Sequence, residues 1–327
     1  MSTAATTSAS HIPVLRDEVL AYLAPQDNEI FVDGTFGAGG YTRAILDAAD
    51  CRVYAIDRDP DAIKRGRVME KEFAGRLTVL EGCFADMDDL LAAEDVSSVD
   101  GVTLDVGVSS MQLDEADRGF SFMNDGPLDM RMAQSGQSAA DVVNSASEED
   151  LMVMFRDLGE ERHAGLIARA IIKDRAEVPF ATTRQLATLA ERVLGKFYKS
   201  KKGSKKIHPA TRIFQALRIH VNDELGQLSR GLMAAKKVLA PGGRLAVVSF
   251  HSLEDRMVKT FLLQESGGAP KGSRHQPDDP SGPGVSHSFK LLKRGAVKAS
   301  KAEEARNPRA RSARLRVGER LAEGASS

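Results

Sequence analysis

The sequence predicts an α/β protein built on a parallel sheet, with a small helical domain inserted into it. Apolar runs of strand length alternate with helical patterns through the first hundred residues, which is typical of βαβ units. Three of these runs end at an aspartate, and the first leads into a glycine-rich turn. Roughly 140 residues then separate the fourth run from the fifth, whereas a crossover unit needs only about 30. These observations predict a doubly wound sheet that is interrupted once.

The predicted elements follow one another in a regular order. Helices are expected after the first two strands, and Pro60 suits the first turn of the second of these helices. The fifth strand follows the turn of Pro241, Gly242 and Gly243. The predicted strands are 29–33, 52–56, 77–80, 99–104 and 244–249, the two helices are 41–49 and 60–73, and a surface loop is expected at 266–287.

The inserted segment is predicted to be helical, because its apolar residues recur at three- and four-residue steps. One helix is expected to begin at Ser147 and to end at Gly159, a second follows Ala164, and a third follows Thr183. One long helix over 217–239 is expected to return to the sheet. We therefore predict a sheet domain in two parts, residues 1–112 and 210–327, and a helical domain at 113–209.

Composition limits the class of protein. The 327 residues carry 45 Lys and Arg against 46 Asp and Glu, so no overall charge indicates a nucleic-acid partner. With only Cys51 and Cys83, a disulfide framework is excluded. No apolar run reaches the roughly 20 residues of a membrane helix, and residues 1–10 lack the features of a secretory signal. We expect a soluble, cytoplasmic protein that does not bind membranes. The oligomeric state is left open, a homodimer included.

The glycine-rich turn from Asp33 to Gly40 lies between a strand and a helix, where open α/β sheets bind ligands. A P-loop needs Lys where Gly40 stands, and a dinucleotide fingerprint needs Gly where Thr42 stands. The remaining pattern, acidic-x-x-x-G-x-G, resembles the first motif of methyltransferases that use S-adenosylmethionine (SAM). A tight strand-to-helix turn without a ligand is the alternative.

Two further strand ends carry acidic residues. Asp57 follows Gly37 by 20 residues, which is the spacing at which a carboxylate meets ribose hydroxyls. A helix cap is the alternative there, although Asp59 is the better cap. Asp105 ends the fourth strand, where residues near a transferred group lie, and it could equally be a turn residue. Phe84 follows the third strand and could pack on an adenine ring or in the core.

The strand ends also constrain the methyl acceptor. Neither cysteine stands where cytosine C5 methylation would need a nucleophile, and no Lys stands where ribose methylation would need a base. An exocyclic amine needs only hydrogen-bond acceptors. Many amino methyltransferases use D-P-P-aromatic for this purpose, whereas 105–110 is DVGVSS, so the stacking aromatic is missing or supplied elsewhere.

Two basic stretches favour a polyanionic partner, since clustered cations bind phosphates. The first, 195–212, contains Phe197, Tyr198 and His208 among its cations, and the second lies between Lys290 and Arg316. Solvated loops are the alternative. After the fifth strand, His251 and Glu254 have the chemistry of metal ligands, but no supporting pair exists. A helix start with Ser252 as cap and Asp255 reaching back is favoured there, and no metal is expected.

The chain resembles the bacterial ribosomal small-subunit RNA methyltransferases that modify N4 of a cytidine in the 16S decoding centre. The resemblance covers nearly the whole chain, and the segment RGFSFMNDGPLDMRM (118–132) is its most specific part. The other matching stretches are 33–41, 55–60, 104–114, 159–162, 208–222, 249–256 and 307–312.

The resemblance implies a Rossmann-like SAM-dependent methyltransferase fold whose helical insert helps to hold RNA. It implies direct in-line transfer of the SAM methyl group to N4 of a cytidine near the P site of 16S rRNA, within the 30S subunit. The family often has His where this chain has Tyr41, so a backbone contact is expected there. Asp105 is expected to be the catalytic residue, as the acceptor either for a hydrogen of the target amine or for the amino group of the methionine part of SAM, and the sequence does not separate these two roles. The implied SAM contacts are Gly39, Gly40, Tyr41, Asp57, Phe84, Asp105 and Gln112.

Two alternatives to this function stay open at this point. One is an N-methyltransferase for DNA or a small molecule, against which the missing D-P-P-aromatic sequence argues. The other is a non-catalytic nucleoside-binding factor in ribosome assembly.

Overall fold

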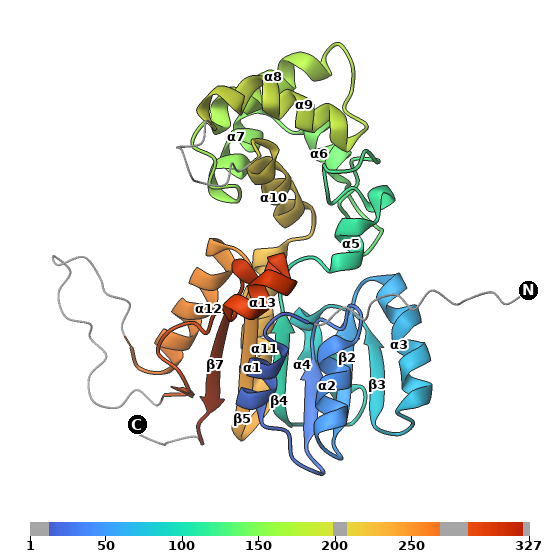
Figure 1. Cartoon of the computed structure of the whole chain (residues 1–327), viewed down its shortest axis with the longest axis vertical. Coiled ribbons are helices and arrows are strands. Elements are labelled where there is room, and N and C mark those ends of the chain that lie inside the picture. The colour runs from blue at the N-terminus through green and yellow to red at the C-terminus, as the bar shows by residue number, and fades with distance from the viewer. Residues whose placement is uncertain (1–12, 199–207, 269–286, 323–327) are drawn as a thin grey trace, which may run out of the picture. The chain divides into compact units, whose positions relative to one another are not determined.

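The chain forms two compact units in the computed structural model, which describes residues 13–198, 208–268 and 287–322. The first unit, the sheet unit, consists of Met1–Gly107 and Gly226–Ser327, and the second, the helical unit, consists of Val108–Leu225 (Figure 1). The predicted helical insert, 113–209, is therefore too short at both ends. No helix in the described ranges combines the length and the apolar composition that a membrane span requires.

The sheet unit contains a seven-stranded sheet with the order β3-β2-β1-β4-β5-β7-β6. The first five strands are parallel, and β7 runs antiparallel to both of its neighbours. The predicted α/β class and all five predicted strands are confirmed. The strands are β1 (Ile30–Asp33), β2 (Arg52–Asp57), β3 (Leu77–Glu81), β4 (Val99–Asp105), β5 (Leu239–Ser249), β6 (Phe289–Leu291) and β7 (Arg314–Arg320).

The order of the strands reverses between β1 and β4, and such a switch point is where open α/β sheets bind ligands. Adjacent residues of one strand belong to different apolar cores, because side chains alternate between the two faces. Phe31 packs with one cluster and Val32 with the other, and both are buried. The helices of this unit are α1 (Arg16–Leu23), α2 (Gly40–Ala48), α3 (Pro60–Glu72), α4 (Met87–Ala92), α12 (Ser252–Glu265), α13 (Lys301–Arg306) and most of α11 (Glu224–Val238).

The helical unit has one apolar core of its own, to which α6 to α10 contribute. Ser147 caps α7 as predicted, since its side chain accepts the Asp150 N–H. Thr182 caps α9 in the same way through the Gln185 N–H. The helices are α5 (Ser110–Asp114), α6 (Ala139–Ser145), α7 (Glu148–Asp157), α8 (Ala164–Arg175), α9 (Thr183–Leu194) and α10 (Ala210–Val221).

The predicted long helix over 217–239 is wrong, because two helices, α10 and α11, occupy most of this segment. Asp223 between them has a φ of 48°, which a continuous right-handed helix does not allow. The Asn222 side chain accepts the Met132 N–H and donates to the Met130 carbonyl, which fixes the end of α10. Since the apolar face of α10 belongs to the core of the helical unit, the predicted boundary at 209 falls before a helix of that unit.

Candidate active site

The turn between β1 and α2 requires glycine. Gly39 has a φ of 77°, and a Cβ there would lie 2.8 Å from atoms of Phe36 and of Met69. A Cβ on Gly40 would lie 2.8 Å from Pro13. Asp33, which is fully buried, holds the turn by accepting the Thr35 N–H and both the N–H and the hydroxyl of Thr42. The backbone of this turn is thus fixed, and its glycines allow Phe36, Met69 and Pro13 to pack directly against it.

Asp57 ends β2 beside this turn. One of its carboxylate oxygens accepts the Gly37 N–H at 2.7 Å, and the other accepts the Asp59 N–H at 2.9 Å. Burial raises the pKa of this carboxyl, and these backbone hydrogen bonds partly counter the effect. The prediction that Asp59 is the better cap is confirmed, since Asp59 caps α3 by accepting the Asp61 N–H. Asp57 is therefore not the residue that caps this helix.

Asp105 ends β4, next to β1 in the sheet. Burial raises its pKa to about 8, with further contributions from the charges of Asp33 and Glu254. Burial likewise raises the pKa of Asp33 to about 6. The Asp105 Oδ1 atom is buried and has no hydrogen-bond partner among the described residues. A buried carboxylate oxygen without a partner is costly, so this atom is suited to a ligand that donates a hydrogen bond.

The other predicted contact residues have clear structural environments. The Tyr41 hydroxyl donates to the Val14 carbonyl, so its side chain fastens the segment before α1 rather than pointing to a ligand. Phe84 lies at the start of a short 3₁₀ turn (Phe84–Asp86) and packs against Gly231 of α11. Gln112 belongs to the helical unit, where it forms a capping box with Ser109. Of the seven predicted residues, Asp57 and Asp105 end strands, Gly39 lies in the turn, and Gly40 and Tyr41 begin α2. Phe84 also lies in the sheet unit, whereas Gln112 is in the other unit.

The segment after β5 differs from the prediction. His251, not Ser252, caps α12, and Glu254, not Asp255, reaches back to the cap backbone. Glu254 is 2% exposed, and one of its oxygens accepts the N–H groups of Phe250 and His251. Its other oxygen lies 2.9 Å from His251 Nε2. Asp255, which was expected to reach back to the cap, instead pairs with Arg316 of β7. The sequence could have indicated this role, because Glu254 is the third residue of α12, where a glutamate can bond back to the cap backbone.

Three carboxylates, Asp33, Asp57 and Asp105, therefore end neighbouring strands of one sheet. Because like charges disfavour one another's ionisation, such a group of carboxylates gains stability when a cation is bound. SAM carries a sulfonium and an ammonium group beside a ribose with two hydroxyls. The orphaned oxygen of Asp105, the carboxylate of Asp57 and the glycine turn supply acceptors and backbone space for such a molecule, so the residues present fit it.

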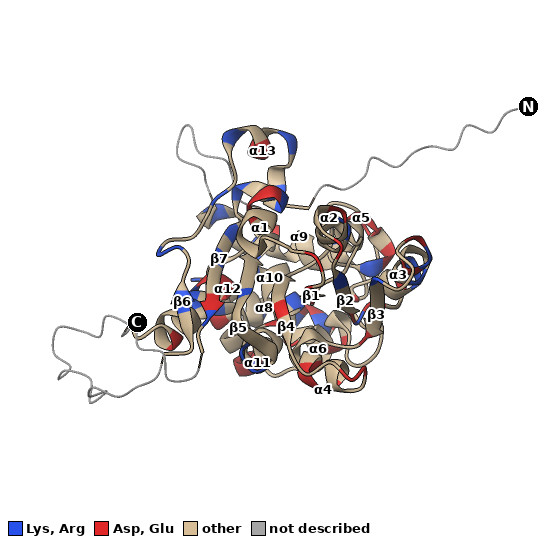
Figure 2. Ribbon diagram, turned by 90° about the horizontal axis from the view of Figure 1, so that it is seen from below, with Lys and Arg blue, Asp and Glu red and all other residues tan. Residues whose placement is uncertain are grey.

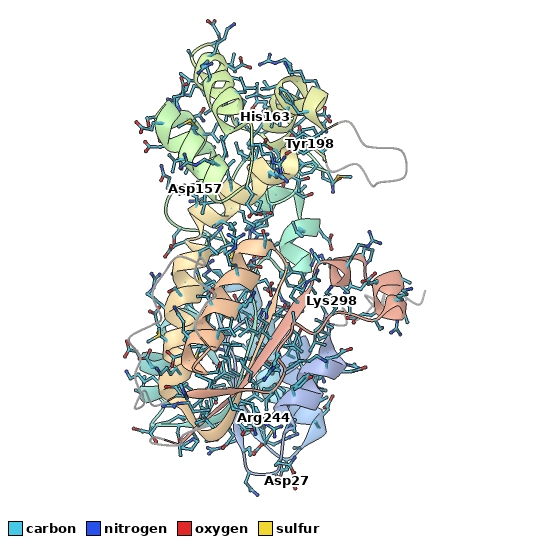
Figure 3. The ribbon with its side chains drawn as sticks, turned by 90° about the vertical axis from the view of Figure 1, so that its left-hand side faces the viewer. Asp27, Asp157, His163, Tyr198, Arg244 and Lys298 are labelled. Carbon is cyan, nitrogen blue, oxygen red and sulfur yellow. The ribbon has the colours of Figure 1, made fainter. Side chains whose placement is uncertain are left out.

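The helical unit has an aromatic and cationic surface next to the first basic stretch. Phe197, which is 42% exposed, stacks on His163 with ring centroids 3.7 Å apart, and Lys196 lies near the same ring. The hydroxyl of Tyr198 donates to buried Glu161, which also accepts the His163 N–H (Figure 3). Lysines 201, 202, 205 and 206 lie outside the described residues.

The second basic stretch divides into structural and exposed parts. Arg316 forms an ion pair with Asp255, and Arg314 donates a hydrogen bond to the carbonyl of Ala313. Lys301 and Arg306 stand at the two ends of α13, and the ribbon around this helix is blue in several places in Figure 2. Arg309 lies close enough to Asp105 for its charge to lower the pKa of that carboxyl. Part of this stretch thus pairs with the fold or influences Asp105, rather than forming a solvated loop.

Comparison with known proteins gives the family. The model of the MraW methylase family matches residues 8–321. The chain belongs to the MraW methylase family. It is 56% identical over 313 residues to the ribosomal RNA small subunit methyltransferase H of Rhodospirillum rubrum, covering 95% of this chain and 94% of that protein. It is 57% identical over 316 residues to the protein of the same name from Bradyrhizobium diazoefficiens, covering 96% of this chain and 92% of that protein.

Membership in the MraW methylase family confirms the predicted activity class and methyl donor: the protein is a SAM-dependent methyltransferase. The sheet and its order confirm the predicted Rossmann-like fold. Among solved structures, a methyltransferase from Streptococcus mutans in complex with SAH has a TM-score of 0.41 and 11% identity, covering 95% of this chain and 99% of that chain.

Proposed function

We propose that this MraW methylase methylates the N4 amino group of a cytidine in the decoding region of 16S rRNA, within the small ribosomal subunit. The names of its relatives support an RNA of the small subunit as substrate. The observation that supports amine methylation is the Asp105 carboxyl at the end of β4, whose Oδ1 is buried and lacks a hydrogen-bond partner in the described part of the chain. We infer that the protein acts in the cytoplasm, where its substrate is assembled.

The roles of the site residues follow from their positions. The backbone of Gly39, Gly40 and Tyr41 borders the methionine part of SAM, which needs space free of a Cβ. Asp57 accepts hydrogen bonds from the ribose hydroxyls. Phe84 packs on the adenine face. Gln112, from the helical unit, is the remaining SAM contact of this proposal.

Asp105 holds the acceptor amine. The N4 lone pair attacks the methyl carbon as the carbon–sulfur bond breaks, so that S-adenosylhomocysteine leaves with the electron pair. The nitrogen, which becomes cationic as the new bond forms, then loses one of its two protons. Asp105 accepts a hydrogen bond from N4–H and so turns the lone pair toward the methyl group. Holding the reactants in this arrangement supplies much of the rate. The cytosine must leave its stack in the RNA to reach the site.

Methyl transfer to isolated small ribosomal subunits tests this function. The subunits should come from cells that lack the enzyme, and SAM labelled in its methyl group should be the donor. Digestion to nucleosides is expected to give label in N4-methylcytidine. Label in another nucleoside, or label in DNA, would refute the proposed acceptor. Binding of SAM and RNA without any transfer would instead identify a non-catalytic assembly factor.

A further inference from the structure

The acceptor site lacks an aromatic residue on β4, where amino methyltransferases with D-P-P-aromatic carry one. After Asp105 the chain continues with Val106, Gly107 and Val108. A planar base held only by a hydrogen bond from its amino group could still rotate about that bond. The ring therefore needs a second, flat contact, and the structure offers a candidate on the neighbouring strand.

Phe250 lies beside this position. β4 and β5 are parallel, and Asp105 is the register partner of Val248. Continuing that register by two residues places Gly107 opposite Phe250. The contacts agree, since a Cβ on Gly107 would lie 3.8 Å from the Phe250 ring. Phe250 also packs at the margin of the apolar cluster that contains Val248, so both side chains lie on one face of the sheet.

The backbone of Phe250 is held in place by Glu254. The Phe250 N–H donates to Glu254 at 2.8 Å, and Glu254 is anchored at the start of α12 by the cap with His251. Gly107 has a φ of 115°, and only Glu254 and Phe250 atoms would approach a Cβ there, both at 3.8 Å. Gly107, two residues after Asp105, thus brings no side chain against the ring of Phe250. Phe250 itself is only half-buried.

We propose that Phe250 is the stacking residue of the acceptor site, with the target base lying on its ring while Asp105 accepts from the amino group. The inference rests on the proposed function, because it assumes a planar base with an exocyclic amine. The pair of groups that other amino methyltransferases carry on one strand end is here divided between β4 and β5. Glu254 is then a positioning residue, since it acts by holding Phe250.

The placement of Asp105 and Phe250 on two different strands has a chemical consequence for specificity. A flat aromatic contact selects a planar base of either size, whereas Asp105 selects the amine. An aliphatic amine would satisfy Asp105 but would leave the ring of Phe250 uncovered.

The test compares three variants of the full chain. Phe250→Leu removes the flat ring, Phe250→Tyr keeps it, and Phe261→Leu is the matched control. Phe261 is a half-buried phenylalanine on α12 that makes an edge contact with Phe289 on the opposite face of the sheet. Methyl transfer to small subunits is measured as kcat/KM, and SAM affinity is measured by calorimetry.

We expect Phe250→Leu to lower kcat/KM by about ten- to a hundredfold, the range of one base stack on an aromatic ring, with SAM affinity unchanged. Phe250→Tyr should stay within about threefold of the wild type by the same reasoning, and Phe261→Leu should match the wild type. Equal activity of Phe250→Leu and Phe261→Leu would overturn the inference, as would equal losses in Phe250→Leu and Phe250→Tyr. If the wild-type protein itself transfers no methyl group, the proposed function has failed instead.

Discussion

At the scale of single residues, the site is organised by aspartates that end parallel strands. Asp57 and Asp105 could be predicted because a strand end is visible in the sequence and the carboxyl ends of parallel strands share one edge. Asp33 ends β1 in the same way, yet its carboxylate is fully used by the turn and Thr42. Glu254 was missed, because the sequence was interpreted with Ser252 as the cap of α12, whereas the cap is His251, one residue earlier.

The first prediction concerns Asp57. Replacing it with Ala should weaken SAM binding by about 1–3 kcal/mol, because the ribose hydroxyls would lose their acceptor. Isothermal titration calorimetry measures the change. Asp47→Ala, which alters an exposed aspartate of α2, is the control. Asp57→Asn keeps an acceptor for the turn, so its SAM affinity should lie between those of Asp57→Ala and the control. Unchanged affinity in both Asp57 variants would rule out the ribose contact.

The second prediction concerns Asp105 and pH. Its pKa is about 8 in the folded protein, whereas an unfolded aspartate titrates near 3.8. Between these values the folded state binds more protons, so the free energy of unfolding falls as pH rises from about 4 to about 8. Asp105→Asn cannot lose this proton. The unligated variant should therefore melt higher than the wild type at pH 8, by roughly 2–4 °C per kcal/mol gained.

Thermal unfolding at pH 5, 7 and 9 without SAM checks this difference. The gap between variant and wild type should widen with pH and stop widening above about pH 8. Asp33, with a raised pKa of about 6, contributes the same trend to both proteins and cancels. A gap that is constant across the pH range would show that the Asp105 carboxyl titrates normally. Methyl transfer by Asp105→Asn should be low at every pH.

At the scale of elements, the glycine turn could be predicted and the C-terminal strands could not. The turn shows itself through glycine spacing after an apolar run. β6 and β7 are short or lack a continuous apolar run, and β7 contains three arginines, one of which is neutralised by Asp255. Similarly, α1 has only two buried residues, Val19 and Leu23. Elements whose stability comes from tertiary contacts leave little trace in local pattern.

The third prediction separates the two costs of a side chain in the turn. Gly39→Ala must accept a left-handed backbone, which costs about 1–2 kcal/mol, and must also displace Phe36 or Met69. Gly75→Ala is a matched control, because Gly75 has nearly the same φ, 79°, but nothing within 4 Å of a Cβ. We expect Gly39→Ala to be the less stable variant in urea unfolding and to bind SAM more weakly. Equal stability of the two would mean that the turn relaxes freely.

At the scale of the whole molecule, the interruption of the sheet was predictable from the distance between strands, but its boundaries were not. The sequence periodicity continues through Asn222 and Asp223, and only their hydrogen bonds and backbone reveal the break. The two units have separate apolar cores. A destabilising substitution in one of these cores should therefore affect SAM binding and methyl transfer to RNA to different extents.

The fourth prediction uses this separation. Ile167→Ala removes a fully buried side chain of α8 and should destabilise the helical unit by about 2–5 kcal/mol. Methyl transfer to small subunits should fall. Calorimetry should show little change in SAM affinity, since the sheet unit supplies most of the contacts. Leu91→Ala, an equally buried change in the sheet unit, should weaken SAM binding more. The reverse order would show that the units do not fold separately.

The position of β7 has a consequence for biosynthesis. This strand follows both β5 and β6 in the chain, yet it is an interior strand, paired with β5 on one side and β6 on the other. Until β7 has been synthesised, β5 exposes an unpaired edge, and such edges invite aggregation and proteolysis. A polypeptide released before residue 314 would keep that edge permanently.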